Sequence, residues 1–428
     1  MVLSPSFFNR VKIYMKYNHS ILKNGLRVIS VQIQDSQVAN ISIWFKAGYG
    51  YETDNECGYT HLFEHLLFCG TKRRPDNYAV NIEKDKIGAY SNAFTFKDQL
   101  YFLIQSGSNY MDQMFDLLSD MILNSSIKED VVENEKMIVT QELRKIQGDR
   151  MASSDRIQME NFFNGHPLAK NILLSGETIK KASYKELKDF YRFFCIPTRA
   201  AVVVSGNSSH VEVVALCEKY FGSWNSGEGS EFKTDIYKPI INRKQHFFKE
   251  DLGPQTILAV NFYTPGIDSA KENAALNLVA NYLGYGFTGL LYRELRIKKG
   301  LVYNLNSSNW PYENIGIFNI STQTEKPQEA FDIINEKINE LPLSFDKESL
   351  ETLKIQCINS FIRKISDPME VMKFMGRGFV INNPMRSPDE YIKSIQSVTY
   401  EDIIGVIKKY LVSSNRFIFV QGPKDIKF

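Results

Sequence analysis

This chain has few cysteines and histidines, and its net charge is small. Its 428 residues include five cysteines and six histidines, and 51 Lys and Arg against 49 Asp and Glu leave a net charge of +2. Five widely spaced cysteines without a C-x-x-C pair argue for reduced thiols and against a disulfide framework. The small net charge excludes the strongly basic character that nucleic-acid binding usually needs. No apolar run approaches the roughly 20 residues of a membrane span, so we expect none.

The rest of the composition is that of a globular protein with more than one core. Hydrophobic residues make up 43% and charged residues 23%, and 428 residues favour two domains. Residues 1–34 lack Asp and Glu, and residues 7–17 have an amphipathic pattern. Two interpretations stay open, a mitochondrial-type targeting segment and a basic extension of a cytosolic protein. We expect a cytoplasmic protein, with an organellar matrix as the alternative.

Hydrophobic periodicity predicts alternating strands and helices along the whole chain. In the first half we expect strands at 26–33, 38–45, 89–96, 100–105 and 200–204, and helices at 58–68, 76–86, within 110–163, at 183–195 and at 210–220. In the second half we expect strands at 256–262, 302–308, 315–322 and 417–420, separated by helices. Residues 223–230 have no periodicity, which is typical of a linker. We therefore predict domains at 1–222 and 246–428, joined by a linker at 223–245.

The ends of the two halves repeat in detail. Residues 183–187 (SYKEL) resemble residues 399–403 (TYEDI), and 22 residues separate Tyr184 from Gly206 and also Tyr400 from Gly422. In both cases a predicted helix leads into an apolar strand that ends at the glycine. This repetition predicts an α+β protein of two duplicated domains, each a mostly antiparallel sheet covered by helices.

One short motif indicates a metal site. His61 and His65 are four residues apart on a predicted helix, so both imidazoles lie on one face and can hold the same ion. Glu64 lies on nearly the same face, close enough to act on a water molecule at that ion. The order H-x-x-E-H is the inverzincin signature.

A catalytic zinc ion needs a third protein ligand, which can be a His, Asp, Glu or Cys. Glu133, Glu135 and Glu142 lie on a predicted helix, and Glu135 and Glu142 share one face because they are seven residues apart. Spacing alone does not choose among them, since helix surfaces are rich in glutamate. Cys69 shares the helix face of His65, but we interpret it as a packed thiol rather than a ligand.

The segment from His61 to His65, followed by Gly70 and Thr71, resembles the metal motif of the pitrilysin/insulinase family of inverzincin metallopeptidases. The resemblance continues through residues 91–95 (SNAFT) and 166–168 (HPL), and through Arg296 and Tyr303 in the spacing R-x6-Y. It covers essentially the whole chain.

This resemblance implies a zinc endopeptidase with one Zn²⁺ per chain. Glu142 follows His65 by 77 residues and Glu135 by seven, as the third ligand of the family does, so His61, His65 and Glu142 are the implied ligands. Glu64 is then the general base, and Glu135 orients or electrostatically tunes the ligands. The positions that match substrate-contacting residues of the family are Asn92, Ala93, Phe94, Thr95, Arg296 and Tyr303.

The length of the chain resembles the shorter branch of the family, which pairs two-domain subunits as in mitochondrial processing peptidase. This implies a peptide substrate and either a homodimer or a heterodimer with a related subunit. The competing prediction is a non-catalytic or partner-dependent subunit of a heteromeric assembly. A dinucleotide-binding enzyme is a second rival, because residues 284–289 spell G-x-G-x-x-G. That segment follows a predicted helix rather than a strand, which argues against the second rival.

Overall fold

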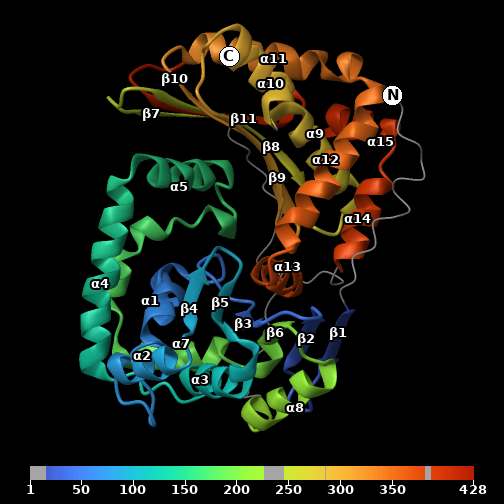
Figure 1. Ribbon diagram of the computed structural model, residues 1–428. Helices are drawn as coiled ribbons and strands as arrows, with labels where there is room; N and C mark the ends of the chain where they lie inside the picture. Colours follow the sequence, from blue (N-terminus) through green and yellow to red (C-terminus); the bar gives the residue numbers. More distant parts are fainter. Residues whose placement is uncertain (1–15, 226–244, 285, 381–386) are drawn as a thin grey trace. The chain divides into compact units, whose positions relative to one another are not determined.

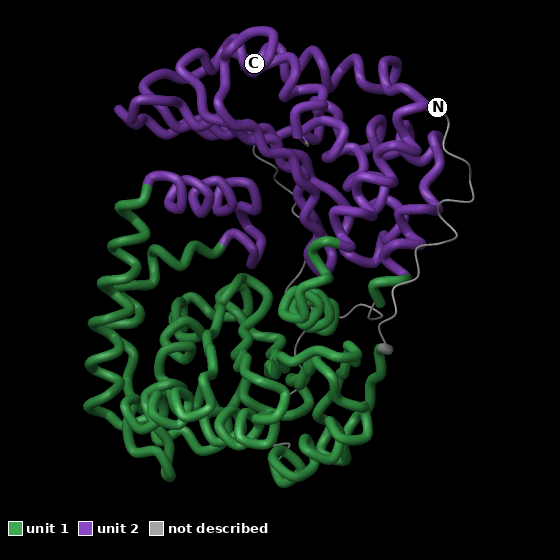
Figure 2. Tube along the Cα trace, viewed as in Figure 1, with its two compact units in different colours: residues 1–149, 170–234, 363–389 green, residues 150–169, 235–362, 390–428 purple. Residues whose placement is uncertain are grey.

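The computed structural model describes residues 16–225, 245–284, 286–380 and 387–428. Its chain forms two compact units, coloured separately in Figure 2. The units are residues 1–149, 170–234 and 363–389 for the first, and residues 150–169, 235–362 and 390–428 for the second. They differ from the two unbroken domains expected from sequence. Residues 150–169 of the first half belong to the second unit, and residues 363–389 of the second half belong to the first unit. Most of the predicted linker, 226–244, and of the amphipathic N-terminal segment lies outside the described residues.

The first unit is built on a six-stranded sheet with the order β1-β2-β6-β3-β5-β4. Its strands are β1 (Lys16–Ile21), β2 (Arg27–Gln32), β3 (Val38–Phe45), β4 (Tyr90–Thr95), β5 (Leu100–Gly107) and β6 (Ala200–Gly206). Its helices are α1 (Tyr59–Leu66), α2 (Asn77–Lys86), α3 (Met111–Leu123), α4 (Glu129–Gly148), α6 (Gly176–Lys181), α7 (Tyr184–Phe194), α8 (His210–Phe221) and α13 (Pro368–Val380). Within this sheet β2 and β6 pair in parallel and the other pairs are antiparallel.

The second unit repeats this plan on a five-stranded sheet with the order β7-β11-β8-β10-β9. Its strands are β7 (His246–Glu250), β8 (Thr256–Pro265), β9 (Leu305–Pro311), β10 (Ile315–Thr324) and β11 (Arg416–Gly422). The helices that lie wholly or mostly in this unit are α5 (Arg150–Phe162), α9 (Ala270–Gly284), α10 (Leu290–Tyr292), α11 (Pro327–Ser344), α12 (Lys347–Ile365), α14 (Pro388–Gln396) and α15 (Tyr400–Tyr410). Again one pair, β7 with β11, is parallel.

The strand orders show the duplication directly. Strands β2-β6-β3-β5-β4 correspond one by one to β7-β11-β8-β10-β9, and β1 is an addition at the edge of the first sheet. The repeated sequence segments have the same local structure, because Ser183 and Thr399 both cap a helix in a capping box. The predicted fold class, duplicated α+β domains with mostly antiparallel sheets, is confirmed.

Helices cover both faces of the first sheet. In Figure 1, α3 and α8 lie against one face and α13, which follows in sequence only after four of the five strands of the second sheet, lies against β3 and β6 on the other. Helix α13 packs closely against β3, because Gly376, which has no side chain, faces the indole ring of Trp44. A Cβ atom on Gly376 would lie 2.1 Å from a ring carbon of Trp44. The second face is therefore a packed interface rather than a solvated one.

The reciprocal segment, α5, packs on the second sheet. Phe162 stacks on Tyr263 with ring centroids 4.1 Å apart, and Phe163 joins the same buried cluster. Gln158 donates to Asn261 at 3.0 Å. Because α5 follows α4 after a single residue, the chain passes from the first unit to the second at Asp149. Each half thus contributes one helix to the unit built by the other.

In the described part of the chain, no helix is long and apolar enough to cross a membrane.

Candidate metal centre

Helix α1 presents two different faces, as its sequence predicts. Leu62, Phe63 and Leu66 are essentially fully buried in the core of the first unit, and Phe63 packs against α7. Burial of each such side chain contributes roughly 1.5–3 kcal/mol, which holds the helix firmly against the core. The opposite positions, His61 and His65, then share the remaining face. Their ring centroids are 5.1 Å apart.

Three side chains converge at this face. His61 and His65 of α1 meet Glu142 of α4, with ligand atoms that all lie within 4.8 Å of one another. One carboxylate oxygen of Glu142 is 3.8 Å from Nε2 of His61 and 3.3 Å from Nε2 of His65. The site is half-open, because the side chain of Glu142 is 42% exposed and that of His61 only 10%.

This donor set fits a zinc ion. Two imidazole nitrogens and one carboxylate oxygen are a donor combination of catalytic zinc sites, which keep a fourth position for water or substrate. Among the described residues the second unit offers no equivalent, since α9 and α12 take the places of α1 and α4 in the order of elements but contain no histidine. A zinc site of this kind is therefore expected in the first unit alone.

Glu135 supports the site from behind. Its carboxylate lies 3.2 Å from Nδ1 of His65, the ring nitrogen that faces away from Glu142. Burial acts to lower the pKa of His65, but hydrogen bonds to Glu135 and Glu142 outweigh it and raise this pKa to about 9. The hydrogen bond to His65 also lowers the pKa of Glu135. Cys69 is half-buried, and its thiol lies 3.4 Å from Glu135 and from the carbonyl of His65, outside the three-ligand group.

Glu64 lies between the two histidines in sequence, and its carboxyl group is partly shielded from solvent. Burial raises its pKa, while a hydrogen bond with Thr95 and the positive charge of His65 oppose that rise. Sequence resemblance assigned Thr95 to substrate contact. Strand β4 packs against α1, which brings the edge of the sheet to the site.

Residues 92–95 lie at the edge of the first sheet. They are part of β4, which is an edge strand paired on one side with β5. Ala93 is buried, whereas Asn92 and Phe94 on the other face of the strand are half-exposed. Phe94 stacks on the ring of Tyr101, 5.1 Å away between centroids. The free edge of β4 is thus available for another extended chain.

Arg296 and Tyr303 lie together in the second unit. The Arg296 guanidinium lies 4.4 Å from the centre of the Tyr303 ring and donates to the carbonyl of Tyr303. Arg296 is part of a π-helical turn, Arg293–Lys298, and strand β9 begins after Tyr303 rather than at it. The glycine-rich segment before this turn follows α9, a helix. Its context therefore differs from the strand-loop-helix of a dinucleotide site.

Sequence reasoning missed Glu52. This side chain is 3% exposed, and its two carboxylate oxygens accept hydrogen bonds from the backbone N–H groups of Gly58 and Thr60, both at 2.7 Å. Burial raises its pKa to about 7, while the hydrogen bonds from Thr60 and Gly58 oppose that rise. A glutamate in a loop before a helix is common in protein sequences, so Glu52 can be recognised only from its burial in the structure.

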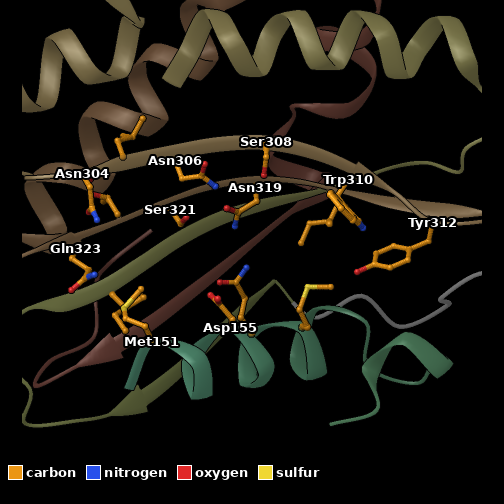
Figure 3. A pocket seen from close by; sticks show the side chains of 16 residues that line it. Met151, Asp155, Asn304, Asn306, Ser308, Trp310, Tyr312, Asn319, Ser321 and Gln323 are labelled. Atoms are coloured by element: carbon orange, nitrogen blue, oxygen red, sulfur yellow. The ribbon is translucent and has the colours of Figure 1, made fainter. Parts of the chain in front are cut away.

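A separate pocket of about 540 Å³ lies wholly within the second unit, between α5 and the strands β9 and β10. Figure 3 shows amide and hydroxyl side chains of these strands, among them Asn306 and Ser308, facing Asp155 of α5, with Trp310 at one end. Asp155 is the one charged residue in its lining, which contains no histidine or cysteine. The lining of this pocket therefore holds no metal-binding set, in contrast to the group of His61, His65 and Glu142.

Comparison with known proteins gives consistent results for both halves. Residues 27–175 match the family profile described as "Insulinase (Peptidase family M16)", and residues 181–357 match "Peptidase M16 inactive domain". A protein named "Uncharacterized zinc protease" from Rickettsia bellii is 26% identical, with 96% of this chain and 98% of that protein covered. A "Mitochondrial-processing peptidase subunit beta" from Lentinula edodes is 24% identical, with 95% and 91% covered.

Solved structures agree on the fold. The crystal structure of a protease from Helicobacter pylori matches with a TM-score of 0.86 at 21% identity, covering 96% of this chain and all of that one. A Pseudomonas fluorescens structure titled as a peptidase M16 inactive domain matches with a TM-score of 0.86 at 19% identity, covering 96% and 99%. At these identities the likeness shows a shared two-unit fold.

Proposed function

This chain belongs to peptidase family M16, and on that premise we propose that it is a zinc-dependent endopeptidase acting on peptides or unstructured segments. The observation that carries the proposal is the convergence of His61, His65 and Glu142, with Glu64 on the same helix. Relatives along the whole chain that are named zinc proteases support the same metal.

The protein's own groups divide the work of peptide hydrolysis. His61, His65 and Glu142 would hold a zinc ion, which would supply Lewis acidity to lower the pKa of water and polarise a carbonyl. Glu64 is the proton carrier, because a half-buried carboxylate with a raised pKa accepts a proton from the attacking water and can return it to the leaving amine. Glu135 is a positioning residue that fixes the ring of His65 through Nδ1.

The free edge of β4 is the proposed binding site for the peptide backbone. An extended peptide that pairs with Asn92, Ala93, Phe94 and Thr95 would lie near Glu64, since β4 packs against α1. Main-chain pairing gives affinity with weak sequence demands. This favours unstructured peptides over folded proteins as substrates.

Arg296 and Tyr303 are proposed to contact the substrate backbone in a dimer. The relatives include proteins named as a beta subunit of mitochondrial processing peptidase, which supports a paired assembly. In a homodimer or a heterodimer with a related subunit, the pair of one subunit would serve the zinc site of the other. The cytoplasm, or an organellar matrix, remains the predicted location.

Mixing two inactive variants tests whether Arg296 of one subunit acts at the zinc site of the other subunit. Glu64→Gln and Arg296→Ala are purified separately, mixed and allowed to exchange. If Arg296 acts across a homodimer, mixed dimers contain one complete site, so activity should recover to roughly a quarter of wild type. Action within one chain predicts no recovery. Full activity in a strictly monomeric preparation would contradict the dimer proposal.

The peptidase proposal itself is tested with a pool of unstructured peptides. Cleavage and zinc content are measured on the wild-type chain and on Glu64→Gln, with Glu83→Gln as a control on the exposed helix α2. We expect wild type and the control to bind zinc and cleave, and Glu64→Gln to bind zinc without cleaving. A folded wild-type protein without zinc would contradict the proposal.

The second candidate is a partner-dependent subunit of a heteromeric processing peptidase. The match of residues 181–357 to a domain described as inactive, together with the beta-subunit relatives, favours it. In that case the purified chain binds zinc but cleaves only after a related subunit is added. The same peptide assay, run with and without that subunit, separates the two candidates.

A further inference from the structure

We infer that Glu52 is a positioning residue for the metal centre, which fixes the first turn of α1 and thereby the place of His61. The inference rests on the proposed zinc site. It concerns a residue outside the ligands, eight positions before the helical turn that it holds.

The contacts of Glu52 are directed at the start of the helix. One carboxylate oxygen accepts the N–H of Gly58 and the other accepts the N–H of Thr60, the residue directly before His61. The first N–H groups of a helix have no partner within it, so an acceptor here determines where the helix begins. A carboxylate is strongly favoured in this place because the helix dipole is positive at its N-terminus.

The start of α1 is enclosed on its other side as well. Gly58 has a φ of 91°, and a Cβ atom there would lie 2.6 Å from the hydroxyl of Ser175 and 2.7 Å from Ile179 of α6. Glycine is therefore required, and the first turn lies between Glu52 and α6. A helix held at this point cannot shift along its axis without losing both hydrogen bonds to Glu52.

The loop that holds Glu52 also contacts the hairpin of the proposed substrate strand. The N–H of Tyr49 donates to the carbonyl of Phe96 at 3.2 Å, and the N–H of Gly50 donates to Lys97 at 2.8 Å. Residues 96 and 97 directly follow β4. The loop that contains residues 49–52 thus contacts both the residues after β4 and the start of α1, and the hydrogen bonds to α1 come from the side chain of Glu52.

Burying a carboxylate costs free energy even when backbone N–H groups donate to it, so the presence of Glu52 at this place needs an explanation. General support of the fold is one reason, and it predicts that Glu52→Gln lowers stability while a folded variant binds metal normally. Positioning predicts a weaker metal site in a folded protein. The two differ in metal affinity, which can be measured without any peptide substrate.

The experiment compares zinc affinity in Glu52→Gln and in Glu56→Gln by competition with a chelator. Glutamine keeps the shape but offers one acceptor oxygen, so either Gly58 or Thr60 loses its partner. Glu56 is a matched control in the same loop, because its half-buried carboxylate accepts hydrogen bonds from the N–H and the hydroxyl of Thr53, whereas the N–H groups of Gly58 and Thr60 donate to Glu52. We expect the dissociation constant to rise about tenfold in Glu52→Gln, as for other residues that orient ligands, and to stay unchanged in Glu56→Gln.

The visible spectrum of the Co²⁺-loaded protein is the second readout, because it reports ligand geometry directly. We expect it to change in Glu52→Gln alone. If circular dichroism shows that variant to be unfolded, Glu52→Asp takes its place, since it keeps the charge but is too short to reach both N–H groups. Wild-type affinity and spectrum in a folded variant would overturn the inference. Failure of the wild-type chain to bind zinc would instead overturn the proposed metal centre.

Discussion

Replacement of Glu135 by glutamine tests how far the site depends on a residue that does not bind the metal. The change removes one negative charge 3.2 Å from Nδ1 of His65 and leaves the size of the side chain unaltered. The two side chains are 15% and 22% exposed, so solvent screens their interaction only in part. The ring of His65 therefore loses a charged partner that both orients it and makes it a better donor to a metal.

The expected loss is moderate. A hydrogen bond to a charged group contributes about 1.5–3 kcal/mol, and the glutamine oxygen can still accept a weaker one from Nδ1. The lower end of that range corresponds to a rise of about tenfold in the dissociation constant for zinc, within the range for such partners. Competition with a chelator of known affinity measures it at constant pH.

Glu133→Gln is the matched control on the same helix. Its carboxylate pairs with Lys136 at 2.6 Å, and its side chain is 63% exposed. Zinc affinity in this variant should equal that of wild type. The reasoning is refuted if Glu135→Gln binds zinc within twofold of wild type, or if both variants weaken binding equally.

Three further predictions concern proton release on zinc binding, stability against pH, and packing. Because the pKa of His65 is raised to about 9 in the metal-free protein, zinc must displace a proton, so chelator competition should show affinity rising about tenfold per pH unit from 7 to 9. The same shift means that the metal-free fold loses stability as pH rises from 6.5 through about 9, which urea unfolding can follow. Gly376→Ala should lower the free energy of unfolding by about 1–3 kcal/mol, because its Cβ would meet Trp44, whereas Gly378→Ala, with open space around it, should not.

Most elements of the fold could be predicted from periodicity, and the exceptions have a common cause. The prediction of a strand at 38–45 coincides with β3, whose residues are almost all buried. Strands β1 and β7 were not predicted, and both are edge strands with few fully buried residues. Alternation of buried and exposed positions is weak in such strands, so the pattern that reveals an inner strand is missing.

The division into units could not be read from sequence for a different reason. Residues 150–169 and 363–389 each continue the helical pattern of their own half. Their composition does not indicate which of the two units they belong to. Trp44 and Gly376 come together only because α13 packs against β3. Such long-range contacts depend on shape, which a local pattern does not contain.

The sequence by itself determined the chemistry of the candidate site. Two histidines four residues apart on an amphipathic helix must share a face, because the helix period places them there. The choice of Glu142 came from family resemblance. The tertiary structure decided what local periodicity cannot: that α4 brings Glu142 to both histidines with Glu135 behind one of them, and that Glu52 holds the start of α1. Those residues are distant in sequence, and only the packing of helices against a common core brings their charges within hydrogen-bonding distance.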